Sequence, residues 1–319
     1  MSGRLKTWAA DWAERRQGSD ALGFTLRRRR IYILPTRFGT VFAALVFAML
    51  LGSLNYGASL GFALTFLLTG LGLVVMHHCH NNLLGAEVRF SGAPAVFAGQ
   101  QAQFRIGLQN KAGATRYELE LDHDGHNSGP VDIEADQGAV LTIAVPARQR
   151  GWLKLRRFAV ATRHPGHLFR AWTWVHMDAL CLVYPEPAPP GRPLPASSLG
   201  DSPRSKPAPG DSDFAGLRAA VRGDPPGRIA WKAYARNGEL LLKQFSSGDE
   251  QPRMLDWDSL PDLDVEARLS QLTRWCLDAA AHTDSFGLRL PNGFIPLGRG
   301  DRHLGDCLRA LALYDGGTA

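Results

Sequence analysis

The sequence predicts a membrane-anchored α+β protein with a two-helix transmembrane hairpin, a β-sandwich and a final unit that mixes helices and strands. Three observations support this fold class. No Lys, Arg, Asp or Glu occurs between Arg37 and Glu87. From Glu87 to Tyr184 the apolar residues alternate with the period of strands. A proline-rich stretch follows, and beyond it both the helical and the strand period occur.

The charge of the chain is concentrated at its beginning. The 319 residues include 36 Lys+Arg and 30 Asp+Glu, for a formal charge of +6. The first 37 residues contain nine basic and three acidic side chains and therefore carry the whole excess, so residues 38–319 are neutral. A neutral body argues against nucleic-acid binding, and 45% hydrophobic residues argue against a disordered chain.

The uncharged run predicts a transmembrane helical hairpin over residues 38–76. As one helix it would be about 58 Å long, roughly twice the ~30 Å hydrocarbon core of a bilayer. The stretch Ser53–Gly57 offers a break, with 17 residues before it (Phe38–Leu54) and 19 after it (Ala58–Met76). Each half is long enough for one span, so two spans joined by a short turn are expected.

The arginines predict the orientation of this hairpin. Arg27, Arg28, Arg29, Arg30 and Arg37 precede the first span, whereas the turn has no charge. Cytoplasmic flanks collect Lys and Arg, so both termini are expected in the cytoplasm of a bacterial inner membrane. The four cysteines form no CxxC pair, which agrees with a reducing compartment and predicts no disulfide.

Residues 1–37 are interpreted as a basic cytoplasmic leader with an amphipathic helix. One helical face carries Leu5, Trp8, Ala9, Trp12 and Ala13. Such a face suits either the headgroup region of the bilayer or packing on the soluble part, and both alternatives stay open.

Residues 86–184 are expected to form an all-β, immunoglobulin-like sandwich. Nine segments with strand character are separated by Gly, Asn, Asp and Pro at the spacing of a sandwich. They are Val88–Phe90, Phe104–Leu108, Tyr117–Leu121, Val131–Ile133, Val140–Val145, Trp152–Leu155, Phe158–Ala161, Phe169–Val175 and Leu180–Tyr184.

Residues 185–212 are interpreted as a linker, because nine of the twenty prolines lie between positions 185 and 210. Proline is excluded from helix interiors and sheet ladders, which predicts an extended, mobile segment. A proline-rich ligand for an aromatic groove is the alternative.

Residues 213–319 predict a truncated α/β unit. Strands are expected at Leu240–Phe245, Arg253–Asp256 and Phe286–Leu290, and helices at Val265–His282 and Leu304–Leu313. The order strand, helix, strand, helix is typical of an α/β layer with parallel strands.

At this point the chain resembles the bacterial domain-of-unknown-function family 58. The matching stretch, 223–243, holds Gly-Asp, then Arg-x-Ile-x-Trp, then Ala-Arg and a Leu-rich strand ending in Lys243. Upstream, 163–169 resembles the family's Pro-x-Gly-Leu-Phe turn, with a departure at His167. The resemblance covers most of residues 37–315 and implies that the final unit is von Willebrand factor A-like.

Members of this family look like companions of MoxR-type AAA+ ATPases and, in some bacteria, of transglutaminase-like membrane proteins. The resemblance therefore implies a scaffold or adaptor with no cofactor. If 228–236 is helical, Arg228, Lys232 and Arg236 share one face beside Trp231, which suits an acidic partner. Alternatively, Asp224 pairs internally with these arginines and the motif is structural.

Three groups of residues carry side chains that could bind a metal. One of them, 122–126, with Asp122, His123, Asp124 and His126, is otherwise expected to form a hairpin turn. A von Willebrand-type site needs Asp-x-Ser-x-Ser, but here Asp256 is followed by Asp258, Ser259 and Leu260. Asp256, Asp258 and Ser259 are therefore weak metal candidates against a solvated acidic loop. His77-His78-Cys79-His80 has ligand-type side chains that diverge on a helix, so the polar end of the second span is the simpler interpretation.

No catalytic constellation is apparent in the sequence. It contains no Gly-x-Ser-x-Gly elbow, Walker loop, His-Glu-x-x-His or Rossmann glycine pattern. We therefore expect a non-enzymatic membrane scaffold, with a metal-dependent or hydrolytic enzyme of envelope maintenance as the alternative.

Overall fold

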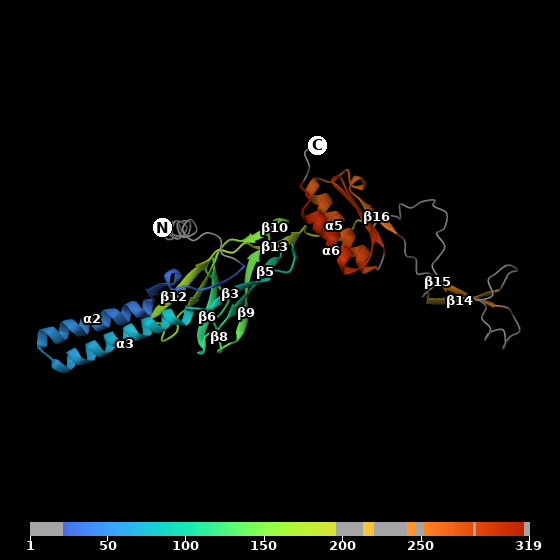
Figure 1. Cartoon of the computed structure of the whole chain (residues 1–319). Coiled ribbons are helices and arrows are strands. Elements are labelled where there is room, and N and C mark those ends of the chain that lie inside the picture. Colours follow the sequence, from blue (N-terminus) through green and yellow to red (C-terminus); the bar gives the residue numbers. More distant parts are fainter. Residues whose placement is uncertain (1–21, 196–212, 220–240, 247–251, 283–284, 316–319) are drawn as a thin grey trace. The chain divides into compact units, whose positions relative to one another are not determined.

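The computed structural model describes residues 22–195, 213–219, 241–246, 252–282 and 285–315. The chain forms two compact units, Met1–Tyr184 and Pro185–Ala319. The first contains the helical hairpin and the antiparallel sheets, and the second contains the mixed α/β elements (Figure 1).

The predicted hairpin is present as two long helices, α2 (Arg37–Tyr56) and α3 (Ser59–Leu83), which lie side by side and extend away from the sheets (Figure 1). Gly57 joins them at φ 62°, a left-handed conformation that glycine adopts without strain. Only 11% and 6% of their most apolar stretches are buried. Both helices are long and apolar enough to cross a membrane, and their exposure is unlike that of helices in a soluble core.

The strands of the first unit form three sheets around one apolar core. The core gathers inward-facing side chains such as Phe104, Ile106, Leu121 and Val160, all at 0% exposure. The sheets have the orders β1-β3-β5-β9, β2-β12-β11-β6-β7 with β8 beside β6, and β10-β13-β4; all pairs are antiparallel except β4–β13. The bounds are β1 Gly23–Thr25, β2 Tyr32–Pro35, β3 Glu87–Gly92, β4 Val96–Phe97, β5 Gln101–Gln109, β6 Arg116–His123, β7 His126–Asn127, β8 Val131–Ile133, β9 Gly138–Pro146, β10 Gly151–Leu155, β11 Phe158–Thr162, β12 Phe169–Val175 and β13 Ala179–Tyr184.

Within residues 1–37, which the sequence predicts to be a basic leader, the structure has two strands that pair with the sheets, β1 and β2. Phe24 pairs with Val88 of β3, and Leu34 pairs with Arg170 of β12. Leu26, between the two strands, is 1% exposed and belongs to the core. Strands of three and four residues show too little alternation to be recognised locally, because their partners are more than 50 residues away. The leader helix expected at residues 5–13 lies outside the described residues.

In the second unit, β16 (Arg253–Asp256) and β17 (Phe286–Leu290) are parallel and joined by helix α5 (Val265–Ala281), as the sequence predicts. Strand β18 (Gly293–Gly298) adds antiparallel to β17, and α6 (Gly300–Ala312) follows. Sequence reasoning missed β18. A separate pair consists of β14 (Asp213–Ala219) and β15 (Leu241–Ser246).

The first part of the predicted linker is attached to this second unit. Between 185 and 195, the carbonyl of Ala188 accepts a hydrogen bond of 2.8 Å from Arg274 Nε on α5. Arg192 forms a paired contact with Asp262, 2.6 Å from Nη2 to Oδ2. The Ala188 N–H also donates to the Ser270 carbonyl at 3.0 Å, so single hydrogen bonds from side chains and backbone hold the segment without a sheet ladder. This part therefore differs from a freely mobile linker, and residues 196–212 lie outside the description.

Candidate functional site

The C-terminal end of α3 is held by one buried arginine. Arg116 on β6 is 4% exposed and donates from Nη1 to the Asn82 carbonyl and from Nη2 to the Leu84 carbonyl, both at 2.6 Å. Its Nε donates to Asn110 Oδ1 at 2.8 Å. Burial lowers the pKa of Arg116, yet an arginine stays protonated in proteins. The guanidinium therefore caps carbonyls that a helix end leaves without partners, and its positive charge offsets the negative end of the helix dipole.

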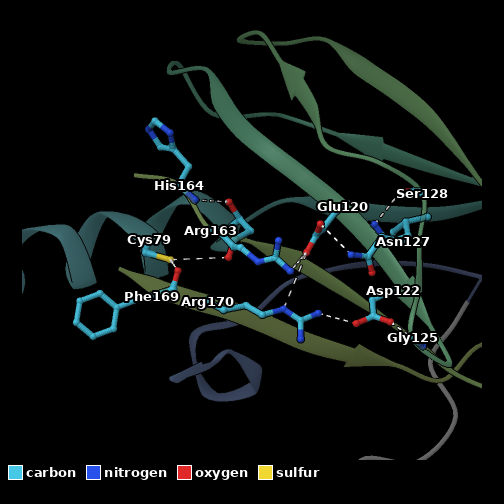
Figure 2. A network of polar contacts seen from close by, with 12 residues as sticks. Cys79, Glu120, Asp122, Gly125, Asn127, Ser128, Arg163, His164, Phe169 and Arg170 are labelled. Carbon is cyan, nitrogen blue, oxygen red and sulfur yellow. Dashed lines mark hydrogen bonds and ion pairs between the residues drawn. The ribbon is translucent and has the colours of Figure 1, made fainter. Parts of the chain in front are cut away.

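Two further side chains fasten the last turns of α3 to the sheets. Asn82 Nδ2 donates to the Tyr117 carbonyl at 2.6 Å and to Thr162 Oγ1 at 2.8 Å, while the Tyr117 N–H donates to Asn82 Oδ1 at 3.0 Å. Cys79 Sγ lies 3.7 Å from the Phe169 carbonyl oxygen. Both residues are labelled in Figure 2. One amide side chain thus pairs with the backbone of β6 as a neighbouring strand would.

The beginning of α2 is held at the same sheet by close backbone contact. Thr36 caps the helix by accepting a hydrogen bond from the Gly39 N–H at 3.0 Å, and its hydroxyl donates to the His167 carbonyl at 2.6 Å. At Gly39, a Cβ would lie 1.9 Å from the Leu168 carbonyl oxygen, so only glycine fits there. We call Thr36, Gly39, Cys79, Asn82 and Arg116 the hairpin junction, because together they attach both helices to the sheets.

A network of charges lies on the neighbouring strands (Figure 2). Glu120 on β6 is 5% exposed and lies 3.5 Å from Arg163 Nη2, and Asn127 Nδ2 donates to its other oxygen at 3.4 Å. Arg170 on β12 contacts Asp122 at 2.7 Å. Each buried carboxylate therefore has a cation or a donor, as burial of charge requires. The network links β6 to β12 and to the turn before it.

The weak metal candidates lie together at the end of β16 and in the short helix η3 (Trp257–Ser259) that follows it, and they line a cavity of 590 Å³. The carboxylate of Asp256 is already used: Oδ1 accepts from the Asp258 N–H at 3.0 Å, and Oδ2 accepts from Arg289 Nη1 at 3.2 Å. The Ser259 hydroxyl donates to the Asp256 carbonyl at 2.5 Å. A guanidinium thus lies where a divalent cation would need to bind. Within the described part of the chain, no group of three or more His, Cys, Asp or Glu is placed to hold a metal ion.

The His77–His80 cluster continues α3 beyond the predicted span, and its side chains diverge. Cys79 is fully buried at the hairpin junction, whereas His77 is exposed and lies 2.8 Å from Asn81 Nδ2. This arrangement agrees with the polar end of a span.

The prediction of a hairpin turn at 122–126 is confirmed, since His123 of β6 pairs with His126 of β7.

The five residues expected to bind a partner, Asp224, Arg228, Trp231, Lys232 and Arg236, lie outside the described residues. Their contacts therefore do not enter the geometry of the site.

The residues of the hairpin junction were missed by sequence reasoning. Arg116 and Asn82 are separated by 34 positions, and neither belongs to a motif. Two signals were present: a glycine in the first turn of an apolar helix, and paired asparagines at 81–82 where the apolar run ends.

Comparison with known proteins adds no family, because no protein-family model and no curated protein sequence matches the chain.

Proposed function

We propose that the chain is an integral scaffold or adaptor of the bacterial inner membrane, with both termini and the folded units in the cytoplasm. One observation carries this proposal. Strands β1 and β2 precede the hairpin, whereas their partners β3 and β12 follow it. Strands joined by backbone hydrogen bonds must share one side of a membrane, so a hairpin that inserts has to cross twice and return.

The arginines favour the cytoplasm as that side. Arg28, Arg29 and Arg30 form the short helix η1 between β1 and β2, and Arg37 is the first residue of α2. The loop at Gly57 has no charge. An excess of Lys and Arg beside a span marks the cytoplasmic flank, so the sheets and the α/β unit belong there.

The partner we propose is a MoxR-type AAA+ ATPase, with a transglutaminase-like membrane protein as a further companion in some bacteria. The support is the resemblance at 223–243, together with the parallel β16–α5–β17 arrangement expected of the start of a von Willebrand factor A-like unit. Such an ATPase is cytoplasmic, which agrees with the proposed orientation. A firmly held hairpin junction suits a scaffold, because it keeps the sheets of the first unit beside the membrane.

A crosslinking pull-down from membranes tests the partner. The double variant R228A/K232A should recover about a tenth or less of the ATPase that the wild type recovers, with unchanged thermal stability. The control R105A/R302A removes two exposed cations that make no ion pair among the described residues, and it should recover the wild-type amount. Equal recovery of the ATPase by both variants, or misfolding of R228A/K232A, would show that the motif at 223–243 is not a partner surface.

Topology separates this proposal from the alternative of a hydrolytic envelope enzyme. A fluorescent reporter fused after Ala319 should be active in the cytoplasm, and alkaline phosphatase at the same position should be inactive. Activity of the phosphatase alone would place the folded units in the periplasm and overturn the scaffold proposal.

A further inference from the structure

The position of η1 relative to the hairpin follows from backbone hydrogen bonds. The Leu26 N–H donates to the Ala86 carbonyl at 2.8 Å, and the Gly85 N–H donates to the Leu26 carbonyl at 2.9 Å. Residue 26 therefore lies beside the end of α3, and Arg27 follows it directly. From Met76, the last residue of the apolar run, to Leu83 the helix rises about 10 Å. Arginines just beyond this level lie about one Debye length, ~8–10 Å, from the edge of the hydrocarbon core, and the headgroup phosphates of an inserted hairpin lie nearer still.

The first three arginines of this segment carry charge that no other described residue offsets. Arg27, Arg28 and Arg29 are exposed, and none of them makes an ion pair with another described residue. The carboxylate on the strand beside them, Glu87, is already paired, 2.7 Å from Lys111 Nζ. Its pKa is lowered chiefly by that hydrogen bond, so it stays ionised and bound to its own partner. Three positive charges thus face outward from the membrane end of the sheets.

The backbone that carries these charges is held in place. The Arg30 N–H donates to the Arg27 carbonyl at 3.0 Å and closes a tight turn. On either side of the turn, β1 is bound to β3 and β2 is bound to β12. A surface held in this way loses little backbone freedom when it binds a ligand, in contrast to a basic tail.

We propose that Arg27, Arg28 and Arg29 form a binding surface for the headgroups of anionic phospholipids in the protein's own membrane. The inference rests on the proposed insertion of the hairpin. Guanidinium groups match phosphate oxygens with paired hydrogen bonds, and this surface meets phosphates at the membrane face. On this proposal the arginines do more than set the orientation of the hairpin: they give the protein a preference for one class of lipid, bound at one place.

The experiment uses the full chain, purified in a zwitterionic detergent and titrated at low salt with phosphatidylglycerol or phosphatidylcholine. Native mass spectrometry counts the retained lipids. The variant R27Q/R28Q/R29Q keeps Arg30 and Arg37 and hence much of the orientation signal. The control R105Q/R148Q/R156Q removes the same charge from exposed positions on β5 and on loops of the sheets, away from the hairpin junction.

The wild type and the control should prefer phosphatidylglycerol, and R27Q/R28Q/R29Q should bind it about 100-fold more weakly at low ionic strength, roughly fivefold for each arginine near a charged surface. Equal loss in both triple variants would show that only net charge matters and would overturn the inference. So would retention of the preference in R27Q/R28Q/R29Q. Carbonate extraction of membranes separates the two proposals: release of the wild type refutes insertion itself, whereas resistance without a lipid preference refutes only the headgroup surface.

Discussion

Replacement of Arg116 by methionine tests whether the hairpin junction holds the helices to the sheets. The substitution keeps much of the side-chain volume but removes the hydrogen bonds to the Asn82 and Leu84 carbonyls and to Asn110. Hydrogen bonds to a charged group contribute about 1.5–3 kcal/mol each, and each buried acceptor left without its donor costs about 1–3 kcal/mol. The side chain is 4% exposed, so water cannot replace these partners. We expect R116M to lower the free energy of unfolding by about 3–5 kcal/mol.

Thermal unfolding in detergent micelles, followed by tryptophan fluorescence, measures this loss. For a unit of this size 1 kcal/mol shifts the midpoint by about 2–4 °C, so R116M should unfold roughly 6–20 °C below the wild type. R116K keeps the charge without the planar fork and should fall between the two. R105M alters an exposed arginine on β5 and should change the free energy of unfolding by less than about 0.5 kcal/mol. A midpoint for R116M equal to that of R105M would refute the reasoning.

Two further predictions each test one contact, the first in the N-terminal unit and the second in the C-terminal unit. The change Gly39→Ala should loosen α2 from the sheets and speed proteolysis of the β2–α2 connection, because its Cβ would lie 1.9 Å from the Leu168 carbonyl oxygen. The control Gly52→Ala, whose Cβ would meet nothing within 4 Å, should leave the cleavage rate unchanged. Equal cleavage rates for the two variants would contradict the close contact at Gly39. In the second unit, a hydrogen bond from Arg192 lowers the pKa of Asp262, so the attachment is present above the ordinary aspartate range near pH 4 and is lost as the pH falls through the lowered value. The change Asp262→Asn should therefore increase hydrogen exchange across 185–195 at neutral pH, and unchanged protection would rule out a role for this ion pair.

Much of the secondary structure was predictable because its signals are local. The break near Gly57, the strand Phe169–Val175 and the helical period beginning at Val265 all agree with the structure. In the strand and in the helix beginning at Val265, the apolar residues repeat with the period of the element and one face is buried, whereas the hairpin is marked by two uncharged runs on either side of a glycine. The end of α3 was less predictable, since it continues seven residues past Met76 with polar side chains that only the sheets explain.

The candidate sites were predictable only in part. Sequence spacing predicted that Asp256, Asp258 and Ser259 are neighbours at the end of a strand; the structure has Asp256 as the last residue of β16 and the other two in the short helix η3 (Trp257–Ser259). Sequence spacing could not show that Arg289, 33 positions away, uses the Asp256 carboxylate. What a carboxylate binds depends on the side chains beside it. Here that side chain comes from β17, which only tertiary pairing brings next to β16.

The sequence by itself determined the two apolar helices, the concentration of positive charge before them, and the change from strand to mixed periodicity. These properties depend on residues close together in the chain, whose burial follows from their spacing. Only the tertiary structure decided that β1 and β2 join the sheets across the hairpin and that Arg116 caps α3. Those contacts join segments from about 30 to more than 100 positions apart, and their stability comes from satisfying buried polar groups, a requirement that no local pattern records.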